Sequence, residues 1–422
     1  MISIEEIYAW QIFDSIGFPT LAGSLKLTNG QTVFASVPST YSQGKRFVYE
    51  LRDQKKEEFD GFGVKKAVYY INSLIAPKLK GVNPQKQREI DYWLIKADNT
   101  PNKSVLGGNT LLLVSTLIAK AGAASLGLPL FIYLNRLYNN IFKETLNLSD
   151  LPQPIFNIVD GGRHAHTVNF QEYYVFFPKS DSLLTTLNQF FYFKKEIEEN
   201  LLARAVGISF GNFGGYAPNF NTNLDAYEII KEVIFMLNNV NGVDIFLGTD
   251  FSADNYYQND NYNLRDVSLL SKTKYYDYIK KIIDAYHIIY IEDPFSYVDL
   301  ANWKKIYQEK NQEIYIASDF YTASGKNNLI ELIKNKFANT VNIKPSYYGT
   351  ISETFEIINL VKKNNLTLTI GSKSGDTDDS FVADLSVATQ ADFVKFGSLN
   401  RGERVVKYNR LLKIEEEMKK TS

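Results

Sequence analysis

The chain has 422 residues and no cysteine, which excludes disulfide bonds, thiolate catalysis and cysteine-ligated zinc sites. Its formal net charge is −1, so the charge balance gives no support for binding to nucleic acid or to an anionic membrane. No run of about 18 apolar residues occurs, and no basic segment precedes an apolar stretch at the N-terminus. We therefore expect no membrane span and no signal peptide, and we predict a cytoplasmic protein.

The length and composition are those of a globular chain with more than one core. Hydrophobic residues make up 45% and charged residues 22% of the sequence, which is ordinary for a folded domain. A chain of this length is expected to form two domains. A polar, proline-containing stretch near residues 138–150 is typical of a connector, so we place one domain at residues 1–138 and the other at residues 139–422.

The first part of the chain has strand patterns followed by helix patterns. Three short β-type segments are separated by Gly, Pro and Asn-Gly turn signals, which predict a meander. In residues 63–81 the apolar positions recur at helical spacing, and residues 109–127 are apolar nearly all round, as in a buried helix. This order predicts an α+β domain. The buried face expected for residues 63–81 comprises Val64, Val68, Ile71, Leu74 and Ile75.

The second part repeats one unit, a short apolar run that ends in a charged residue and is followed by a helix-length segment. A βα unit of a parallel barrel takes about 30 residues or more, which is close to the observed spacing. The ends of the strands of such a barrel converge on one face, where barrel enzymes have their active sites. We therefore predict a parallel α/β barrel. The charged residues at the ends of its runs are Asp250, Glu292, Asp319, Lys344, Lys373 and Lys395.

Several collinear motifs resemble those of the enolase family, from about residue 7 to residue 418. They include NKSVLGGNTLLLVSTLIAKAGA, LPQPIFNIVDGGRHA, IEDPFSYVDLANW, SKSGDTDDSFVADL and NRGERVVKYNRLLKIEEEM. One such motif is weak, but many in the family's order are a specific signal. The resemblance implies a small N-terminal α+β domain packed on an eight-stranded, TIM-like α/β barrel. It also implies Mg²⁺-dependent interconversion of 2-phosphoglycerate and phosphoenolpyruvate, with a homodimer or larger homo-oligomer as the usual assembly.

The resemblance assigns roles to individual residues of this sequence. Lys344 matches the family's base, and Lys395 matches the lysine that contacts the substrate carboxylate. Asp250 and Glu292 match two of the three carboxylates that bind Mg²⁺, an ion that prefers hard oxygen ligands. The remaining matches are Glu172 on the leaving-group side, the loop histidine His164, and the substrate-side residues Ser39, Lys373 and Ser374.

Other positions depart from the family pattern. Phe213 stands where the family has the glutamate that serves the leaving hydroxyl, and a phenylalanine cannot donate a proton. The third metal position is either Ser318, on the simplest alignment, or Asp319, if the segment slips by one residue. Lys373 replaces an arginine and Ser372 a histidine at the phosphate end, which removes a bidentate guanidinium. Thr40 and Tyr41 replace small residues of the mobile lid.

Three functions are compatible with this pattern. The first is an enolase-like protein whose dehydratase activity is lost or strongly reduced, because the departures cluster at the site. The second is an active but divergent enolase, because both lysines and most carboxylates remain. The third is a binding or scaffold protein on the enolase fold, displayed on the cell surface or acting beside an active relative.

Overall fold

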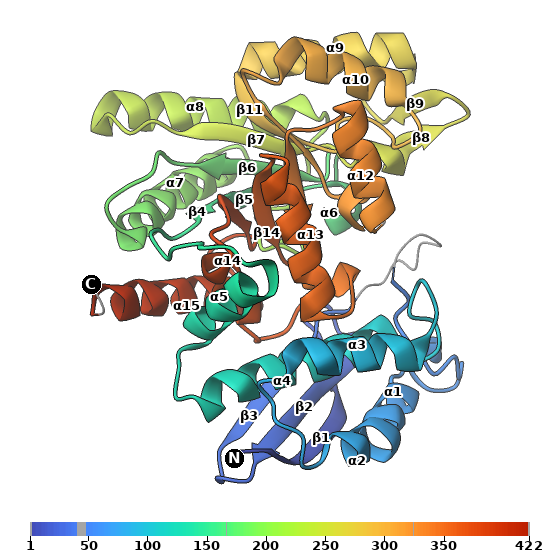
Figure 1. The fold of residues 1–422 in the computed structure, drawn as a ribbon. Coiled ribbons are helices and arrows are strands. Elements are labelled where there is room, and N and C mark those ends of the chain that lie inside the picture. Colours follow the sequence, from blue (N-terminus) through green and yellow to red (C-terminus); the bar gives the residue numbers. More distant parts are fainter. Residues whose placement is uncertain (1, 40–47, 166, 324, 421–422) are drawn as a thin grey trace.

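The computed structural model describes residues 2–39, 48–165, 167–323 and 325–420. Figure 1 shows a small N-terminal unit of strands and helices, in blue, beneath a barrel that contains the rest of the chain. Both parts of the predicted α/β architecture, the N-terminal α+β unit and the C-terminal barrel, are confirmed. The predicted boundary at residue 138 falls within helix α5 (Leu130–Phe142) and stays a prediction.

The N-terminal sheet has the predicted meander form. Strands β1 (Ile4–Phe13), β2 (Pro19–Leu27) and β3 (Thr32–Ser36) pair antiparallel in the order β1-β2-β3. Gly30 forms the tight turn between β2 and β3 with a φ of 87°, a conformation that glycine adopts without steric cost. β2 is the central strand, and most of its residues are buried.

The helix predicted for residues 63–81 forms, but one turn of it is wider than an α-helix. It consists of α1 (Lys65–Tyr69), the π-helical turn η2 (Tyr70–Ile75) and α2 (Ala76–Leu79). A π-turn closes its hydrogen bonds to the residue five positions back, so it rotates later side chains relative to an α-helical face. The prediction for Leu74 is therefore wrong: this side chain is exposed, while Ile71 and Ile75 are buried.

Helix α4 (Gly108–Ser125) is buried on almost every side, as its sequence predicted. It lies between the N-terminal sheet and the barrel, where it contacts β2 and β3 below and α13 (Ile351–Lys363) above (Figure 1). The Ser115 hydroxyl at its centre accepts a 2.9 Å hydrogen bond from the Ile351 backbone N–H of α13. The other helices of this part are η1 (Phe59–Gly61), α3 (Gln87–Asp98) and α5.

The barrel sheet is ordered β4-β15-β14-β13-β12-β11-β7-β6-β5. The two-residue strand β4 and strand β5 are joined through Ile155, whose N–H donates to Val394 O at 2.9 Å, so they act as one strand that closes an eight-stranded barrel. β6 is antiparallel to both of its neighbours, and the others run parallel. The strands are β4 (Gln153–Pro154), β5 (Phe156–Asp160), β6 (Glu172–Phe176), β7 (Phe246–Asp250), β11 (Ile288–Glu292), β12 (Tyr315–Ser318), β13 (Thr340–Ile343), β14 (Thr367–Gly371) and β15 (Phe393–Lys395).

Helices surround this sheet, and a small antiparallel sheet extends from it after β7. The helices are α6 (Gly162–Ala165), α7 (Leu183–Ala203), α8 (Leu224–Asn241), α9 (Lys272–Tyr286), α10 (Leu300–Lys310), α11 (Phe320–Ala323), α12 (Lys326–Asn335), α13, α14 (Phe381–Ala388) and α15 (Gly402–Lys419), with the short turns η3 (Ala253–Tyr256) and η4 (Pro345–Tyr347). The small sheet comprises β8 (Tyr257–Gln258), β9 (Asn261–Leu264) and β10 (Ser268–Ser271).

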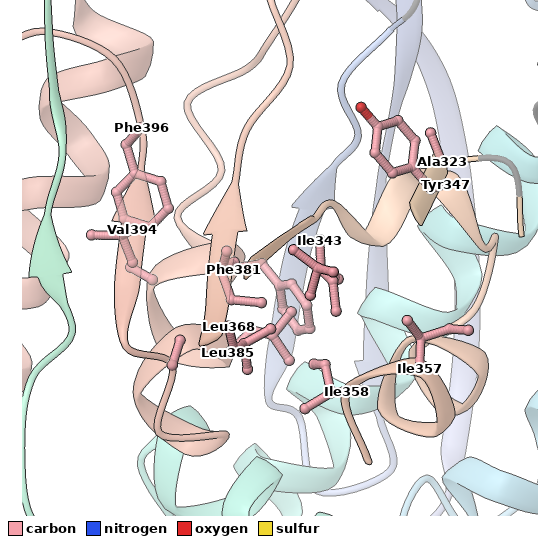
Figure 2. Close-up of a cluster of buried hydrophobic side chains, with 14 of the residues drawn as sticks. Ala323, Ile343, Tyr347, Ile357, Ile358, Leu368, Phe381, Leu385, Val394 and Phe396 are labelled. Carbon is pink, nitrogen blue, oxygen red and sulfur yellow. The ribbon is translucent and has the colours of Figure 1, made fainter. Parts of the chain in front are cut away.

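The apolar core fills the space between the strands and these helices. Figure 2 shows part of it, where Ile343 of β13 and Leu368 of β14 face Ile358 of α13 and Leu385 of α14. These side chains are fully buried, so they fix the strand ends from which the polar side chains project. Among the described residues no single helix has the length and apolar character to cross a membrane; only α4 and α5 taken together, bent by 104°, meet that test.

Candidate active site

Four carboxylates form a row across the C-terminal face of the barrel. The strand register pairs Asp160 with Glu172, Glu172 with Asp250, and Asp250 with Glu292. Because β6 runs antiparallel to its neighbours, its first residue, Glu172, reaches the same face as the last residues of β5, β7 and β11. All four side chains are buried, so they require compensating positive charge or protonation.

Lys395, at the end of β15, supplies that charge. Its Nζ lies 3.0 Å from Glu292 Oε1, 3.4 Å from Asp250 Oδ2 and 3.8 Å from Glu172 Oε2. Burial favours the neutral amine, but the three carboxylates outweigh it and raise the pKa of Lys395 well above its usual range. The lysine is therefore an ammonium that holds three strands' carboxylates together.

The pKa values of these acids diverge. Burial raises the pKa of Glu292 to about 7, and neighbouring Asp250 adds to this effect. Burial also acts to raise the pKa of Glu172, but Lys395 and His164 outweigh it and lower that pKa to about 2. Acids with divergent pKa values side by side are a common property of catalytic sites.

Lys344, directly after β13, is bound to Asp319, directly after β12. The distance from Lys344 Nζ to Asp319 Oδ2 is 2.8 Å, and the Tyr347 hydroxyl donates to the same oxygen at 2.8 Å. The other oxygen, Asp319 Oδ1, is buried without a hydrogen-bond partner among the described residues. The structure thus brings the predicted base and the predicted third carboxylate into direct contact.

Ser318 points away from this pair. Its hydroxyl donates to Asp293 Oδ1 at 2.8 Å and accepts from the Tyr321 backbone N–H at 3.2 Å. Desolvation, with Asp250 and Glu292 nearby, raises the pKa of Asp293 well above its usual range. Ser318 is therefore engaged in a local network, and of the two alternative residues Asp319 is the one that faces Lys344.

The residues around Lys395 fit a magnesium ion held by two carboxylates better than one held by three. Asp250 and Glu292 carry the hard oxygens that Mg²⁺ prefers, and this ion commonly uses one or two carboxylates together with its substrate. Within the described ranges no three histidine or acidic side chains are arranged to hold a metal ion together. Asp319 Oδ1 is a buried carboxylate oxygen without a hydrogen-bond partner among the described residues, but its carboxylate is held on Lys344.

Phe213 packs beside His164 and Arg404, where the resemblance places the leaving-group side of the site. Its ring centroid lies 4.9 Å from that of His164 in an edge-on arrangement, and the Arg404 guanidinium carbon lies 4.5 Å from the ring centroid. The Phe213 backbone N–H donates to Asp160 Oδ2 at 3.1 Å, and its carbonyl accepts from Ser398 N–H at 2.9 Å. The ring is buried and held from several directions, and it carries neither an acid nor a base.

His164, on the short helix α6, contacts Glu172 with an Nε2 to Oε1 distance of 3.3 Å. The resemblance to enolase placed Glu172 on the leaving-group side and matched His164 to a loop histidine, and the structure brings the two side chains into contact. Asp160 lies next to them. Burial raises the pKa of Asp160 to about 7, while the two backbone N–H groups of Phe213 and Gly215 and the Asn157 amide donate to its carboxylate.

Lys373, predicted to lie at the phosphate end, is contacted from the N-terminal domain. Lys373 Nζ lies 3.8 Å from Glu50 Oε1, and Glu50 also binds Arg52 at 2.7 Å. Desolvation lowers the pKa of Lys373. The neighbouring residues Ser372 and Ser374 bind Arg404, through the Ser372 hydroxyl at 3.0 Å and the Ser374 carbonyl at 2.6 Å.

Ser39 is tied to the loop that carries Lys373. Its backbone N–H donates to Gly375 O at 2.9 Å, and its hydroxyl donates to Asp14 Oδ2. The predicted lid changes at Thr40 and Tyr41 lie outside the described residues. A small pocket lies between the two domains beside these loops. It is lined in part by Val37, Leu112, Lys344, Lys373, Phe381 and Lys407.

Asp160 and Tyr347 are among the site residues that were not predicted from the sequence. Asp160 ends the apolar run IFNIVD, so the rule that selected Asp250 and Glu292 would have found it if applied to the first barrel strand. Tyr347 lies in the turn after β13, and no feature of the sequence distinguishes it from the adjacent Tyr348.

The sequence matches known proteins along almost its whole length. The family model "Enolase, N-terminal domain" matches residues 4–134, and "Enolase, C-terminal TIM barrel domain" matches residues 149–422. The enolase of Ehrlichia canis (strain Jake) is 38% identical over 423 residues, covering 99% of this chain and 97% of that protein. The enolase of Ehrlichia chaffeensis is 38% identical over 420 residues, with 98% and 96% covered, and that of Ehrlichia ruminantium (strain Welgevonden) is 35% identical over 415 residues, with 98% and 96% covered. This chain belongs to the enolase family.

Proposed function

We propose that this protein is an enolase-type lyase that retains the proton-abstraction half of the reaction on 2-phosphoglycerate and has lost most of the dehydration half. The observation that carries this proposal is the position of Phe213, whose ring packs against His164 on the leaving-group side. The lysines Lys344 and Lys395 remain, buried and paired with carboxylates.

The retained half requires a base near the carbon next to the substrate carboxylate. Lys344 is suited to this role once its ammonium has released a proton to solvent. Its nitrogen then takes the proton from C2, and the electron pair of the C–H bond moves into the carboxylate to form an enediolate. Lys395 lies across the barrel mouth and offers positive charge to that developing dianion.

The impaired half is the expulsion of the C3 hydroxyl, which must leave as water and therefore needs a proton donor. The low pKa of Glu172 keeps it ionised, and Phe213 carries no proton to donate. Loss of a positioned general acid costs about 10²–10⁴-fold in rate. The enediolate therefore returns to 2-phosphoglycerate by taking a proton back from Lys344 more often than it loses water.

Enolases are generally Mg²⁺-dependent, and we propose that Asp250 and Glu292 hold Mg²⁺ here, with Asp319 as the weaker third group. A bound Mg²⁺ supplies positive charge to the carboxylate end of the substrate. With two carboxylates in place of three, we expect weaker binding of the ion.

The test is incubation of the purified protein with 2-phosphoglycerate and Mg²⁺ in D₂O. Mass spectrometry measures deuterium at C2, and the ultraviolet absorbance of the product measures phosphoenolpyruvate. We expect C2 exchange at least about tenfold faster than phosphoenolpyruvate formation. Equal rates would show an active divergent enolase, and absence of both would show a non-catalytic protein of the binding or scaffold type.

The active alternative has one specific observation in its favour, the 3.3 Å contact between His164 and Glu172. A protonated imidazole there could supply the proton that Phe213 cannot. We also propose a cytoplasmic homodimer, on the basis of the family relationship and the cysteine-free sequence. Light scattering coupled to size-exclusion chromatography tests the dimer, and a mass of one chain would contradict it.

A further inference from the structure

Tyr347 contacts three of the predicted site residues at once. It is the last residue of η4, the turn that follows Lys344. Its ring centroid lies 5.3 Å from Lys344 Nζ and 5.0 Å from Lys373 Nζ, and its hydroxyl donates to Asp319 Oδ2 at 2.8 Å. The side chain is buried and stands at the edge of the apolar cluster in Figure 2.

The ring and the hydroxyl have different physical effects. The face of an aromatic ring attracts a cation within about 6 Å of its centroid, so one ring restrains both ammoniums although they repel each other. Without the ring, Lys373 has Glu50 as the nearest carboxylate toward which to turn, at 3.8 Å in the present arrangement. An ammonium bound closely to a carboxylate is less available to an incoming anion.

The hydroxyl acts on Asp319. Asp319 Oδ2 accepts from both Tyr347 and Lys344, so the phenol fixes the carboxylate in the orientation that pairs with the base. A hydrogen bond to a charged group contributes more than one between neutral groups. Loss of the hydroxyl would free the carboxylate to rotate and would change the position of the Lys344 nitrogen.

We propose that Tyr347 is a positioning residue with two separable parts: its hydroxyl holds Asp319 on the base Lys344, and its ring keeps Lys373 directed toward the anionic end of the ligand. This inference rests on the proposed function, which assigns those lysines to proton abstraction and to the phosphate. It adds a residue that acts on both ends of the site.

Two substitutions separate the parts. Tyr347→Phe keeps the ring and removes the hydroxyl, while Tyr347→Leu removes both. The matched control is Tyr348→Phe, because the adjacent Tyr348 hydroxyl donates to the Thr322 backbone carbonyl at 3.2 Å, outside the set of lysines. Thermal unfolding of each variant shows that it is folded before the other measurements.

For Tyr347→Phe we expect the maximal C2 exchange rate to fall about tenfold while the Kd for inorganic phosphate, measured by calorimetry, stays within about twofold. For Tyr347→Leu we expect in addition about fivefold weaker phosphate binding. Tyr348→Phe should leave both quantities unchanged. Unchanged exchange in Tyr347→Phe, unchanged phosphate binding in Tyr347→Leu, or equal losses in Tyr348→Phe would each overturn the proposal.

Two of these readouts do not depend on turnover. Phosphate calorimetry reports on Lys373 even if the wild type exchanges no proton. The rate at which acetic anhydride acetylates Lys344, followed by mass spectrometry, reports on the Asp319 contact and should rise at least about twofold in Tyr347→Phe. A wild type without C2 exchange but with both of these changes would refute the proposed function and support the role of Tyr347, whereas unchanged acetylation and phosphate binding would refute that role.

Discussion

The Phe213 ring meets the His164 imidazole edge-on, with the two planes at 75° and the centroids 4.9 Å apart. The Arg404 guanidinium lies against the same ring, 4.5 Å from its centroid. The apolar ring therefore lies between a histidine and an arginine. A carboxylate at the same position would have both of these polar side chains as hydrogen-bond or ion-pair partners. The site thus surrounds Phe213 with partners suited to an acidic side chain.

Phe213→Glu should therefore restore part of the dehydration step. The new carboxylate would have Arg404 and His164 as neighbours, and we expect phosphoenolpyruvate formation to rise at least about tenfold while C2 exchange changes little. The measurement is the ratio of the two rates. Phe210→Glu, at an exposed position, introduces the same charge as a control and should not alter this ratio. An unchanged ratio in Phe213→Glu would show that more than the missing acid limits dehydration.

Lys344→Met should abolish the proton-abstraction step. The substitution keeps an unbranched side chain but removes the nitrogen, so we expect C2 exchange to fall by about 10²–10⁴-fold. Deuterium incorporation measured by mass spectrometry provides the rate. Lys362→Met is the control. Lys362 lies on α13, and its ammonium donates to the Gln390 backbone carbonyl at 2.9 Å. Exchange that persists in Lys344→Met would assign the base to another group.

Ser318→Asp should tighten Mg²⁺ binding and lower the stability of the ion-free protein. The new carboxylate would lie beside Asp293, whose oxygen is 2.8 Å from the present hydroxyl, so repulsion should lower the unfolding temperature in the absence of Mg²⁺. We expect at least about tenfold tighter Mg²⁺ binding by calorimetry. Ser318→Asn, which adds similar volume without charge, should not gain affinity. Equal Mg²⁺ affinity in the wild type and Ser318→Asp would mean that Asp319 already serves as the third ligand.

Asp160→Asn should change how stability depends on pH. Burial raises the pKa of Asp160 from 3.8 to about 7 in the folded protein. An acid with a raised folded-state pKa contributes stability that is fully present below pH 3.8 and is lost as the pH rises to about 7. The free energy of unfolding of the wild type should therefore fall relative to Asp160→Asn across this window, by up to about 4 kcal/mol, because the two pKa values differ by about 3 units and each unit is worth about 1.4 kcal/mol.

Urea unfolding at several pH values between 4 and 8 measures this difference for the Asp160 variant. Asp244→Asn, a change at an exposed position, serves as the control and should leave the profile of the wild type intact. Parallel profiles for Asp160→Asn and the wild type would show that the pKa of Asp160 is the same in the folded and unfolded states.

Much of the fold could be predicted because it depends on periodic patterns. The apolar runs that end in Asp250 and Glu292 formed barrel strands, and the apolar stretch at residues 109–127 formed the buried helix α4. Leu74 was missed because a π-helical turn changes the angular spacing of side chains without leaving a mark in the apolar pattern. Local widening of this kind depends on tertiary packing.

The site was less accessible from the sequence because its contacts join residues far apart in the chain. Strand-end charges indicated which residues share the barrel face, but not that Lys395 would lie among three carboxylates while Lys344 pairs with Asp319 alone. Spacing could not decide between Ser318 and Asp319, since consecutive residues at a strand end differ mainly in direction. The structure shows Ser318 turned to Asp293, a choice set by the adjacent loop.

Helix α4 has a consequence for how the chain unfolds. Its side chains belong to one continuous apolar core that includes the N-terminal sheet, the barrel strands and the helices around them. Neither the N-terminal sheet nor the barrel can open without exposing that helix to water. We therefore expect the two domains to unfold cooperatively, as one unit. A destabilising substitution in the N-terminal domain should therefore lower the melting temperatures of both domains equally, and unfolding should remain a single transition.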